Sequence, residues 1–243
     1  LDRSIKVYKT ALSIKPDDVE VYNNMGLVLQ EQGKLEEALE AYNKAIAINP
    51  DYAGAYTNMG NAFKEQDKFE EALEAYIKAI AIKPDYAGAY SNMGLVLQEQ
   101  GKSEEALEAF NKAIAINPDY AGAYRNMGLV LQEQGKSEEA LEAYNKAIAI
   151  KPDHAEAHNN MGLVLQEQGK LEEALEAFKK ALAVEPDHAG AHSNMGLVLY
   201  YQGKNGEALE AHTKALAIKP DHADIQFNSS FAFLNSGRLK EGL

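Results

Sequence analysis

Apolar residues recur along this chain at the spacing of amphipathic helices, in two runs within every 34 residues. In the first complete stretch, residues 19–52, Tyr22, Met25 and Leu29 fall at positions i, i+3 and i+7. After Gly33 a second run takes up the same kind of spacing with Leu35, Ala38, Leu39, Tyr42, Ala45 and Ile46. A period near 3.6 residues predicts an amphipathic helix for each run. Each 34-residue stretch is therefore predicted to be two helices joined by a tight turn.

The prolines mark the same period. All seven lie 34 residues apart, at Pro16, Pro50, Pro84, Pro118, Pro152, Pro186 and Pro220. A strict period of this length is typical of stacked repeats, because one short repeat cannot bury its own apolar face without neighbours. We expect residues 1–18 to hold the second helix of a truncated repeat, residues 19–222 to hold six complete repeats, and residues 223–243 to hold a partial, degenerate seventh repeat.

Glycine, proline and aspartate separate the helices. A glycine follows the first helix of most repeats, where a left-handed residue ends a helix without a Cβ penalty. Asp67 takes this place in the second complete repeat. The second helix ends ahead of proline, which disfavours helical backbone in the preceding residue. The aspartate after each proline, such as Asp17 or Asp51, is expected to cap the next helix.

The 34-residue repeat resembles the tetratricopeptide repeat, and the resemblance covers essentially the whole chain. Three positions of the repeat carry this resemblance. They are a small residue on the first helix, a small residue on the second helix and an aromatic residue one turn after the second of these. The glycines of the first helix are Gly26, Gly60, Gly94, Gly128, Gly162 and Gly196. The alanines of the second helix are Ala38, Ala72, Ala106, Ala140, Ala174 and Ala208. The aromatic residues are Tyr42, Tyr76, Phe110, Tyr144 and Phe178, with His212 as the outlier.

This resemblance implies an all-α fold, a right-handed superhelical solenoid of antiparallel helix pairs whose first helices line the concave wall. Glycine and alanine would let the paired helices approach closely, with the aromatic ring filling the space beside them. The resemblance says little about function, because proteins with this fold bind many different partners. The array is further similar to the repeat domain of O-GlcNAc transferase-like proteins, and that similarity lies in a row of asparagines.

One asparagine occupies the same first-helix position of every repeat: Asn24, Asn58, Asn92, Asn126, Asn160, Asn194 and Asn228. Asparagine is a poor helix-interior residue, by about 0.6 kcal/mol relative to alanine. A row of carboxamides could hold the N–H and C=O groups of an extended peptide, and the resemblance implies this role, since such residues contact the bound polypeptide in O-GlcNAc transferases. The alternative is that the repeats are recent copies and the asparagine was copied with them. Selectivity is expected to centre on side chains that break the uniformity of this wall, namely Lys64, Arg125, Tyr200 and Tyr201.

Charge and composition limit the classes of partner that the chain is expected to bind. The formal net charge is −13, with acidic residues in every repeat, whereas nucleic-acid binders usually carry a basic face. We therefore expect a solvated acidic outer surface and no binding to nucleic acid or to a membrane. The chain has no cysteine, which removes disulfide and thiolate chemistry and fits a cytoplasmic location.

Catalysis and metal binding have little support in the sequence. His154/His158 and His188/His192 have the i, i+4 spacing of metal ligands, but tyrosines occupy the same positions of earlier repeats. Histidine is therefore interpreted as filling an aromatic packing position, and no metal or cofactor is expected. The glutamates recur at the repeat period, which favours solvated surface over acid–base work.

The function predicted from the sequence is a non-enzymatic scaffold that binds an extended segment of a protein partner in its concave groove. The alternative is the substrate-recruiting arm of a larger glycosyltransferase-like enzyme. Because both ends of the chain resemble interrupted repeats, head-to-tail self-association through these ends is a further expectation.

Overall fold

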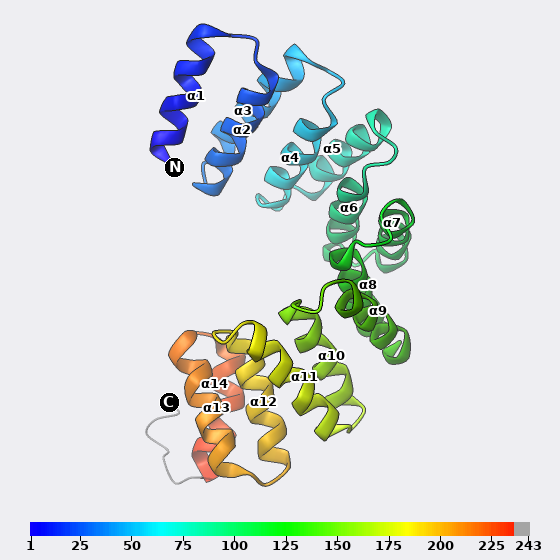
Figure 1. The fold of residues 1–243 in the computed structure, drawn as a ribbon, viewed down its shortest axis with the longest axis vertical. Helices are drawn as coiled ribbons and strands as arrows, with labels where there is room; N and C mark the ends of the chain where they lie inside the picture. Colours follow the sequence, from blue (N-terminus) through cyan, green and yellow to red (C-terminus); the bar gives the residue numbers. More distant parts are fainter. Residues whose placement is uncertain (236–243) are drawn as a thin grey trace. The chain divides into compact units, whose positions relative to one another are not determined.

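The structure, a computed structural model, describes the backbone of residues 1–235 and the side chains of residues 1–230. Residues 236–243, the end of the predicted seventh repeat, lie outside the described part. Within residues 1–235 every regular element is an α-helix, and two kinds of helix alternate (Figure 1). The first helices of the repeats are α2 (Val19–Glu31), α4 (Ala53–Lys64), α6 (Ala87–Glu99), α8 (Ala121–Glu133), α10 (Ala155–Glu167), α12 (Ala189–Tyr201) and α14 (Ala223–Asn235). The second helices are α1 (Asp2–Ile14), α3 (Leu35–Ile48), α5 (Phe69–Ile82), α7 (Ser103–Ile116), α9 (Ser137–Ile150), α11 (Leu171–Val184) and α13 (Asn205–Ile218).

The chain divides into two compact units, residues 1–118 (the N-terminal unit) and residues 119–243 (the C-terminal unit). Within each unit, each first helix from α2 to α12 packs against the second helix that follows it, as α2 does on α3. Each second helix packs in turn on the next first helix of the unit, as α3 does on α4. Each unit is therefore a stack of helix pairs in which contacts run between neighbours, as expected for a repeat array.

The first helices of each unit lie closer together than the second helices do. In the N-terminal unit α2 contacts α4 and α4 contacts α6, and in the C-terminal unit α8, α10, α12 and α14 contact one another in order. Second helices of neighbouring repeats make no comparable contact in the described part of the chain. A stack that is tighter on one side curves toward that side. The first helices therefore line the inner face of each unit.

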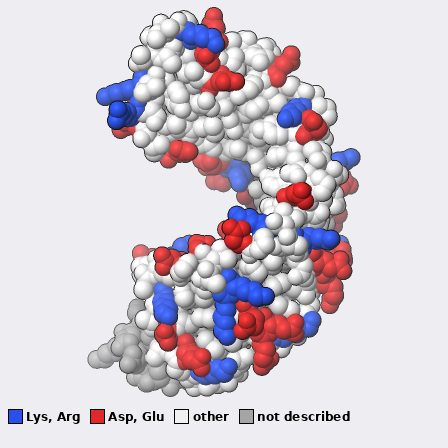
Figure 2. Space-filling model, viewed as in Figure 1, with Lys and Arg blue, Asp and Glu red and all other residues white. Residues whose placement is uncertain are grey.

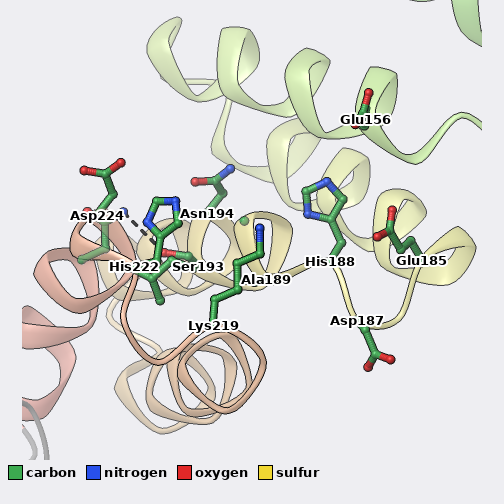
Figure 3. Close-up of a pocket in the computed structure, with 13 residues that line it drawn as sticks. Glu156, Glu185, Asp187, His188, Ala189, Ser193, Asn194, Lys219, His222 and Asp224 are labelled. Carbon is green, nitrogen blue, oxygen red and sulfur yellow. Dashed lines mark hydrogen bonds between the residues drawn. The ribbon is translucent and has the colours of Figure 1, made fainter. Parts of the chain in front are cut away.

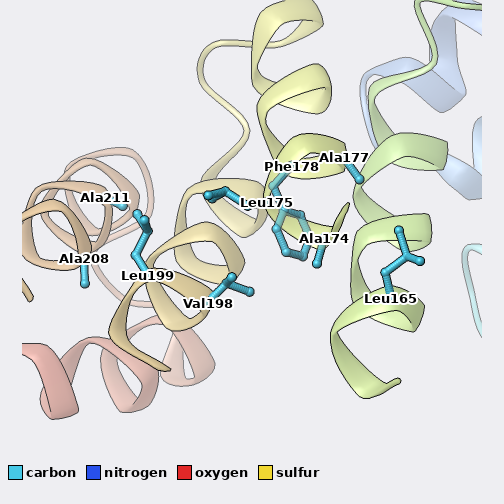
Figure 4. Close-up of a cluster of buried hydrophobic side chains, with 9 residues drawn as sticks. All are labelled: Leu165, Ala174, Leu175, Ala177, Phe178, Val198, Leu199, Ala208 and Ala211. Carbon is cyan, nitrogen blue, oxygen red and sulfur yellow. The ribbon is translucent and has the colours of Figure 1, made fainter. Parts of the chain in front are cut away.

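The core of each repeat is a glycine in contact with an aromatic ring, as the sequence predicted. A Cβ added to Gly162 on α10 would lie 2.6 Å from Cε1 of Phe178 on α11. Phe178 and Ala174 are fully buried. The apolar side chains drawn around them in Figure 4 are Leu165, Leu175, Ala177, Val198, Leu199, Ala208 and Ala211. The same contact recurs at Gly26–Tyr42, Gly60–Tyr76, Gly94–Phe110, Gly128–Tyr144 and Gly196–His212.

The turn after each first helix has left-handed backbone at the predicted residue. The φ angle is 70° at Gly33, and Asp67 adopts a φ of 57° at the equivalent place. The predicted helix caps are wrong by one residue. Pro50 and Asp51 are the central residues of a β-turn, in which the Tyr52 N–H donates to the Asn49 carbonyl oxygen at 3.2 Å. Proline's fixed φ suits the second position of such a turn, so Tyr52 and not Asp51 is the N-cap residue.

Candidate functional site

The asparagine row predicted from the sequence lies on the first helices, between neighbouring repeats. Asn24, Asn58 and Asn92 belong to the N-terminal unit, and Asn126, Asn160, Asn194 and Asn228 belong to the C-terminal unit. Their exposure is uneven. Asn24 is exposed, whereas Asn126 and Asn160 are each only 8% exposed. The others are half-buried.

These asparagines connect one repeat to the one before it. The Nδ2 group of Asn58 donates to Oδ1 of Asn23 at 2.8 Å, and that of Asn194 donates to Oδ1 of Asn159 at 3.0 Å. Asn228 makes a longer bond of the same kind to Oγ of Ser193 at 3.4 Å. In each case the acceptor lies 35 residues earlier in the chain. The asparagines therefore have a structural role that the sequence analysis missed.

A second set of contacts, further along the first helices, also spans 35 residues but runs in the opposite direction, with the donor in the earlier repeat. The Nε2 group of Gln30 donates to Glu65, and that of Gln132 donates to Glu167 at 3.0 Å. At the position equivalent to Gln30, the predicted site residue Lys64 instead forms an ion pair with Glu99 at 3.9 Å. Neighbouring first helices are thus joined by two sets of side-chain contacts.

The repeat that contains Lys64 differs from the other repeats at a second position as well. In other repeats the buried tyrosine of the second helix donates to this glutamine, as Tyr42 does to Gln30 at 2.8 Å. Lysine has no acceptor to offer. The Tyr76 hydroxyl donates instead to Oδ1 of Asn61 at 2.7 Å, and Asn61 stands where the equivalent residue of α2 is Leu27. Burial raises the pKa of Tyr76, which keeps the hydroxyl protonated as a donor.

The predicted site residue Arg125 interrupts the pattern in the C-terminal unit. Its Nη1 group donates to Oδ1 of Asn126 at 2.8 Å, and its Nη2 group forms an ion pair with Glu156 at 3.0 Å. Arg125 lies 35 residues before Asn160, at the position where other repeats supply an acceptor. The Nδ2 group of Asn160 consequently has no hydrogen-bond partner, although Asn160 is buried.

The two tyrosines singled out from the sequence lie at the end of α12. Tyr200 and Tyr201 replace the glutamine and glutamate of other repeats, and their ring centroids lie 5.9 Å apart. Tyr201 is exposed. They therefore add an aromatic surface where other repeats are polar.

A pocket of about 390 Å³ opens in the C-terminal unit beside two of the asparagines. Ser193 and Asn194 of α12 line it together with His188, the residue before α12, Asn228 of α14 and Lys219 from the loop before α14 (Figure 3). Glu156, Glu185, Asp187 and Asp224 also line the pocket. His188 also caps α12, because its Nδ1 atom accepts from the Ala191 N–H at 3.1 Å. Because carboxamide, ammonium and carboxylate groups line this pocket, it suits a polar ligand. The sequence analysis did not predict the pocket.

The histidine pairs are used in packing. His158 and His192 are buried, and each Nε2–H donates to the carbonyl oxygen of a proline, at 3.0 Å for Pro152 and 2.9 Å for Pro186. The described residues contain no group of three or more His, Asp or Glu side chains arranged to hold a metal ion. None of the described helices is both long and apolar enough to span a bilayer. Acidic and basic side chains are interspersed over the face seen in Figure 2.

Similar proteins share this architecture. The model of a family described as the cilia and flagella-associated protein 70 C-terminal domain, a tetratricopeptide-repeat domain, matches residues 4–227. The tetratricopeptide-repeat protein YrrB has 30% sequence identity and a TM-score of 0.58, covering 83% of this chain and 100% of YrrB. No curated protein matches the chain closely enough to count as a relative.

Two less similar structures show the fold alone. A chain of the APC/C hetero-tetramer Cut9–Hcn1 has a TM-score of 0.82 at 18% identity over 95% of this chain, which spans 46% of that chain's length. PilF of Pseudomonas aeruginosa has a TM-score of 0.76 at 21% identity, covering 88% of this chain and 97% of PilF.

These matches confirm the predicted all-α solenoid of antiparallel helix pairs. The matching family is a repeat family and not an enzyme family, and this fold is typical of non-catalytic scaffolds that bind protein or peptide partners. The finer similarity to O-GlcNAc transferase repeats stays a prediction. The chain belongs to the tetratricopeptide-repeat family, in the group described as the cilia and flagella-associated protein 70 C-terminal domain.

Proposed function

We propose that the chain is an interaction scaffold that binds an extended segment of a protein partner on the face formed by its first helices. The observation that carries this proposal is the pocket of about 390 Å³ in the C-terminal unit. Two asparagines of the row, Asn194 and Asn228, line this pocket. Its volume lies within the range of known ligand sites, roughly 300–1,000 Å³, and suits one or two residues of a longer segment.

The chemistry of the asparagines supports a peptide as the occupant. A carboxamide has two N–H donors and an oxygen with two lone pairs. The bond from Asn194 to Asn159 uses one donor, which leaves a donor and an acceptor for a ligand. An extended backbone offers one N–H and one C=O per residue. The asparagine carboxamide is therefore complementary to a peptide backbone, and this contact does not depend on the ligand's side chains.

A similar protein supports the same use of the fold. YrrB is described as a tetratricopeptide-repeat protein with an unusual peptide-binding site. It is 30% identical to this chain over 83% of its length. A role as the substrate-recruiting arm of a larger enzyme, the alternative drawn from the sequence, would use the same face for the same purpose.

The test must separate lost contacts from lost stability, and the chain offers a matched pair of variants. Asn194→Ala removes the carboxamide that lines the pocket together with its bond to Asn159. Asn159→Ala removes the same bond and leaves Asn194 in place. Both should lower the free energy of unfolding, since each deletes one side of the bond between Asn194 and Asn159. Asn159→Ala also removes a long bond of 3.4 Å from Asn159 to Oδ1 of Asn160, so its loss should be equal or slightly larger.

Binding is measured on an array of random 15-mer peptides, followed by fluorescence anisotropy with the strongest binders. Asn194→Ala should weaken binding about fivefold to tenfold, the effect of one or two hydrogen bonds. Asn159→Ala should bind as the wild type does. Equal binding by the wild type and Asn194→Ala would remove the asparagines from the mechanism, and failure of the wild type to bind any peptide would overturn the proposed function.

A further inference from the structure

A groove of about 490 Å³ opens on the outer face of the N-terminal unit. It lies between the second helices α1 and α3, which make no comparable contact with each other, and α2 forms its floor. None of the asparagines of the row lines this groove. A ligand bound there would therefore contact a different face from the one that the proposed function uses.

The floor of the groove is apolar. Met25 and Leu29 are four residues apart, so they lie one turn from each other on the same face of α2. Ile5 of α1 and Ala41 of α3 pack in the same apolar cluster from the two sides. Met25 and Ile5 are only partly buried, so a strip of apolar surface stays open between the two outer helices.

The walls of the groove carry lysines on both sides of this strip. They are Lys6 and Lys9 of α1, Lys34 just before α3, and Lys44 of α3. All four are exposed, and none of them forms an ion pair within the described part of the chain. Only three carboxylates, those of Asp2, Glu37 and Glu40, line the groove as well. Positive charge is therefore in excess here, although the formal net charge of the chain is −13.

The equivalent groove of the C-terminal unit lacks this excess. It has about 530 Å³ and lies between α9 and α11, over Met161 and Leu165 of α10. Two lysines and three glutamates line it. Asn145 of α9 takes the position of Lys9, and Glu142 takes that of Lys6. The two grooves thus share their apolar floor and differ in the charge of one wall.

We propose that the groove between α1 and α3 binds an amphipathic helix of a partner protein, one whose apolar stripe has acidic residues on both sides. The stripe would pack on Met25 and Leu29, as helices dock in apolar grooves through side chains at i, i+3, i+4 and i+7. The acidic residues would pair with Lys6 and Lys9 on one wall and with Lys44 on the other. An apolar floor offers no partner to the backbone of an extended segment, whereas a helix pairs its backbone groups internally.

The test is a selection from a displayed library of peptides of about 18 residues, long enough for several helical turns. Leucine is fixed at i, i+3, i+4 and i+7, and the positions that flank this stripe vary among glutamate, glutamine and lysine. The wild type should enrich peptides with glutamate on both flanks. Failure to enrich any peptide, or enrichment without a preference for glutamate, overturns the proposal.

Exchanging residues between the two grooves locates the site. Lys6→Glu with Lys9→Asn gives the groove of the N-terminal unit the residues of its C-terminal equivalent. It should weaken binding of the selected peptide by about tenfold in fluorescence anisotropy, the effect of two exposed ion pairs. Adding Glu142→Lys and Asn145→Lys to this variant should restore binding, now between α9 and α11. All four positions are exposed, so these variants should fold. Unchanged binding by the first variant overturns the proposal, as does failure of the added lysines to restore it.

Two controls separate docking of a helix from general attraction between charges. Lys146→Glu with Lys151→Asn makes the same change in net charge at exposed positions outside both grooves, and should leave binding unchanged. A proline in the middle of the selected peptide keeps its charge but breaks its helix, and should weaken binding by about tenfold or more. Equal losses in the two double variants, or binding that survives the proline, overturn the proposal.

Light scattering tests the other occupant of this groove, a second copy of the chain. The wild type and Lys6→Glu with Lys9→Asn should have the same mass. A wild-type dimer that dissociates in this variant would assign the groove to self-association and overturn the proposal for a partner helix. None of these results bears on peptide binding at the pocket beside Asn194, because that pocket and this groove share no residue.

Discussion

The side-chain amide of Asn58 donates a 2.8 Å hydrogen bond to Oδ1 of Asn23, one repeat earlier in the chain. The acceptor is buried, and the two residues lie on α4 and α2. The same geometry joins Asn194 to Asn159 in the C-terminal unit. An asparagine row that looks like a binding feature in the sequence is therefore also part of what holds neighbouring repeats together.

Replacing either partner of this bond should destabilise the N-terminal unit. Asn58→Ala and Asn23→Ala should each lower the free energy of unfolding by about 1 kcal/mol. The double variant should cost less than the sum of the two, because both changes delete the same bond. Urea unfolding followed by circular dichroism measures all three. Strictly additive losses would show that the two amides do not interact in solution.

Gly162 is predicted to tolerate no side chain. A Cβ there would lie 2.6 Å from Cε1 of Phe178, so Gly162→Ala should cost about 1–3 kcal/mol through overpacking. Gly206 provides the control, because an added Cβ would meet no atom within 4 Å. It lies in the first turn of α13, where alanine is the better helix former by about 1 kcal/mol. Thermal unfolding should therefore move in opposite directions for the two variants, and equal shifts would contradict the close ring contact.

His212 should make stability depend on pH. It is fully buried, neither ring nitrogen has a partner, and burial lowers its pKa to about 4. An unfolded histidine titrates near 6.5, so between pH 6.5 and 4 the unfolded state binds a proton that the folded state does not. The free energy of unfolding should fall as the pH drops through this range, by up to about 3 kcal/mol.

Phenylalanine at this position provides the control for His212. Phe110 and Phe178 fill the same place in other repeats, so His212→Phe should fold and should be more stable at pH 7 by about 1–3 kcal/mol. Its unfolding should lose the histidine contribution to the pH dependence between pH 7.0 and 5.5. Wild-type and variant curves that stay parallel over this range would contradict the lowered pKa.

The effects of replacing Asn61 and Lys64 on the free energy of unfolding should be coupled. Asn61→Leu restores the residue type of other repeats but removes the acceptor of the buried Tyr76 hydroxyl, at a cost of about 1–3 kcal/mol. It also removes the acceptor of the Asn92 amide, which donates to the same Oδ1 atom at 2.8 Å. Lys64→Gln in the same chain should recover part of this loss, because a glutamine there accepts from the tyrosine in other repeats, as Gln30 does. A double variant no more stable than Asn61→Leu would show that the two exchanges are independent.

The fold follows from local features that repeat along the sequence. Prolines, left-handed glycines and the apolar spacing determine where helices begin and end, and each acts within a few residues. Gly162 and Phe178 could be paired from the sequence because the family pattern already joins them. The caps were misplaced because a proline followed by aspartate can either form a turn or begin a helix, and the choice depends on backbone geometry.

The candidate site was only partly predictable for a different reason. The position of Asn194 on a first helix follows from its spacing, but its bond to Asn159 joins two helices that are 35 residues apart. A search for donors and acceptors at that separation would have found the pairs, and would have shown Arg125 as the residue that lacks an acceptor. The pocket beside Lys219 depends on how α12 and α14 pack, which no local pattern reports.

The repeats look interchangeable in sequence, but the contacts between Gln132 and Glu167 or between Asn194 and Asn159 give each junction a direction. The donor and the acceptor of one contact belong to different copies, so every copy must suit both the copy before it and the copy after it. Shuffling the copies would preserve each helix pair and still create mismatched junctions, most severely next to the copy that carries Arg125. The linear order of the copies is therefore itself a part of the information that the sequence encodes.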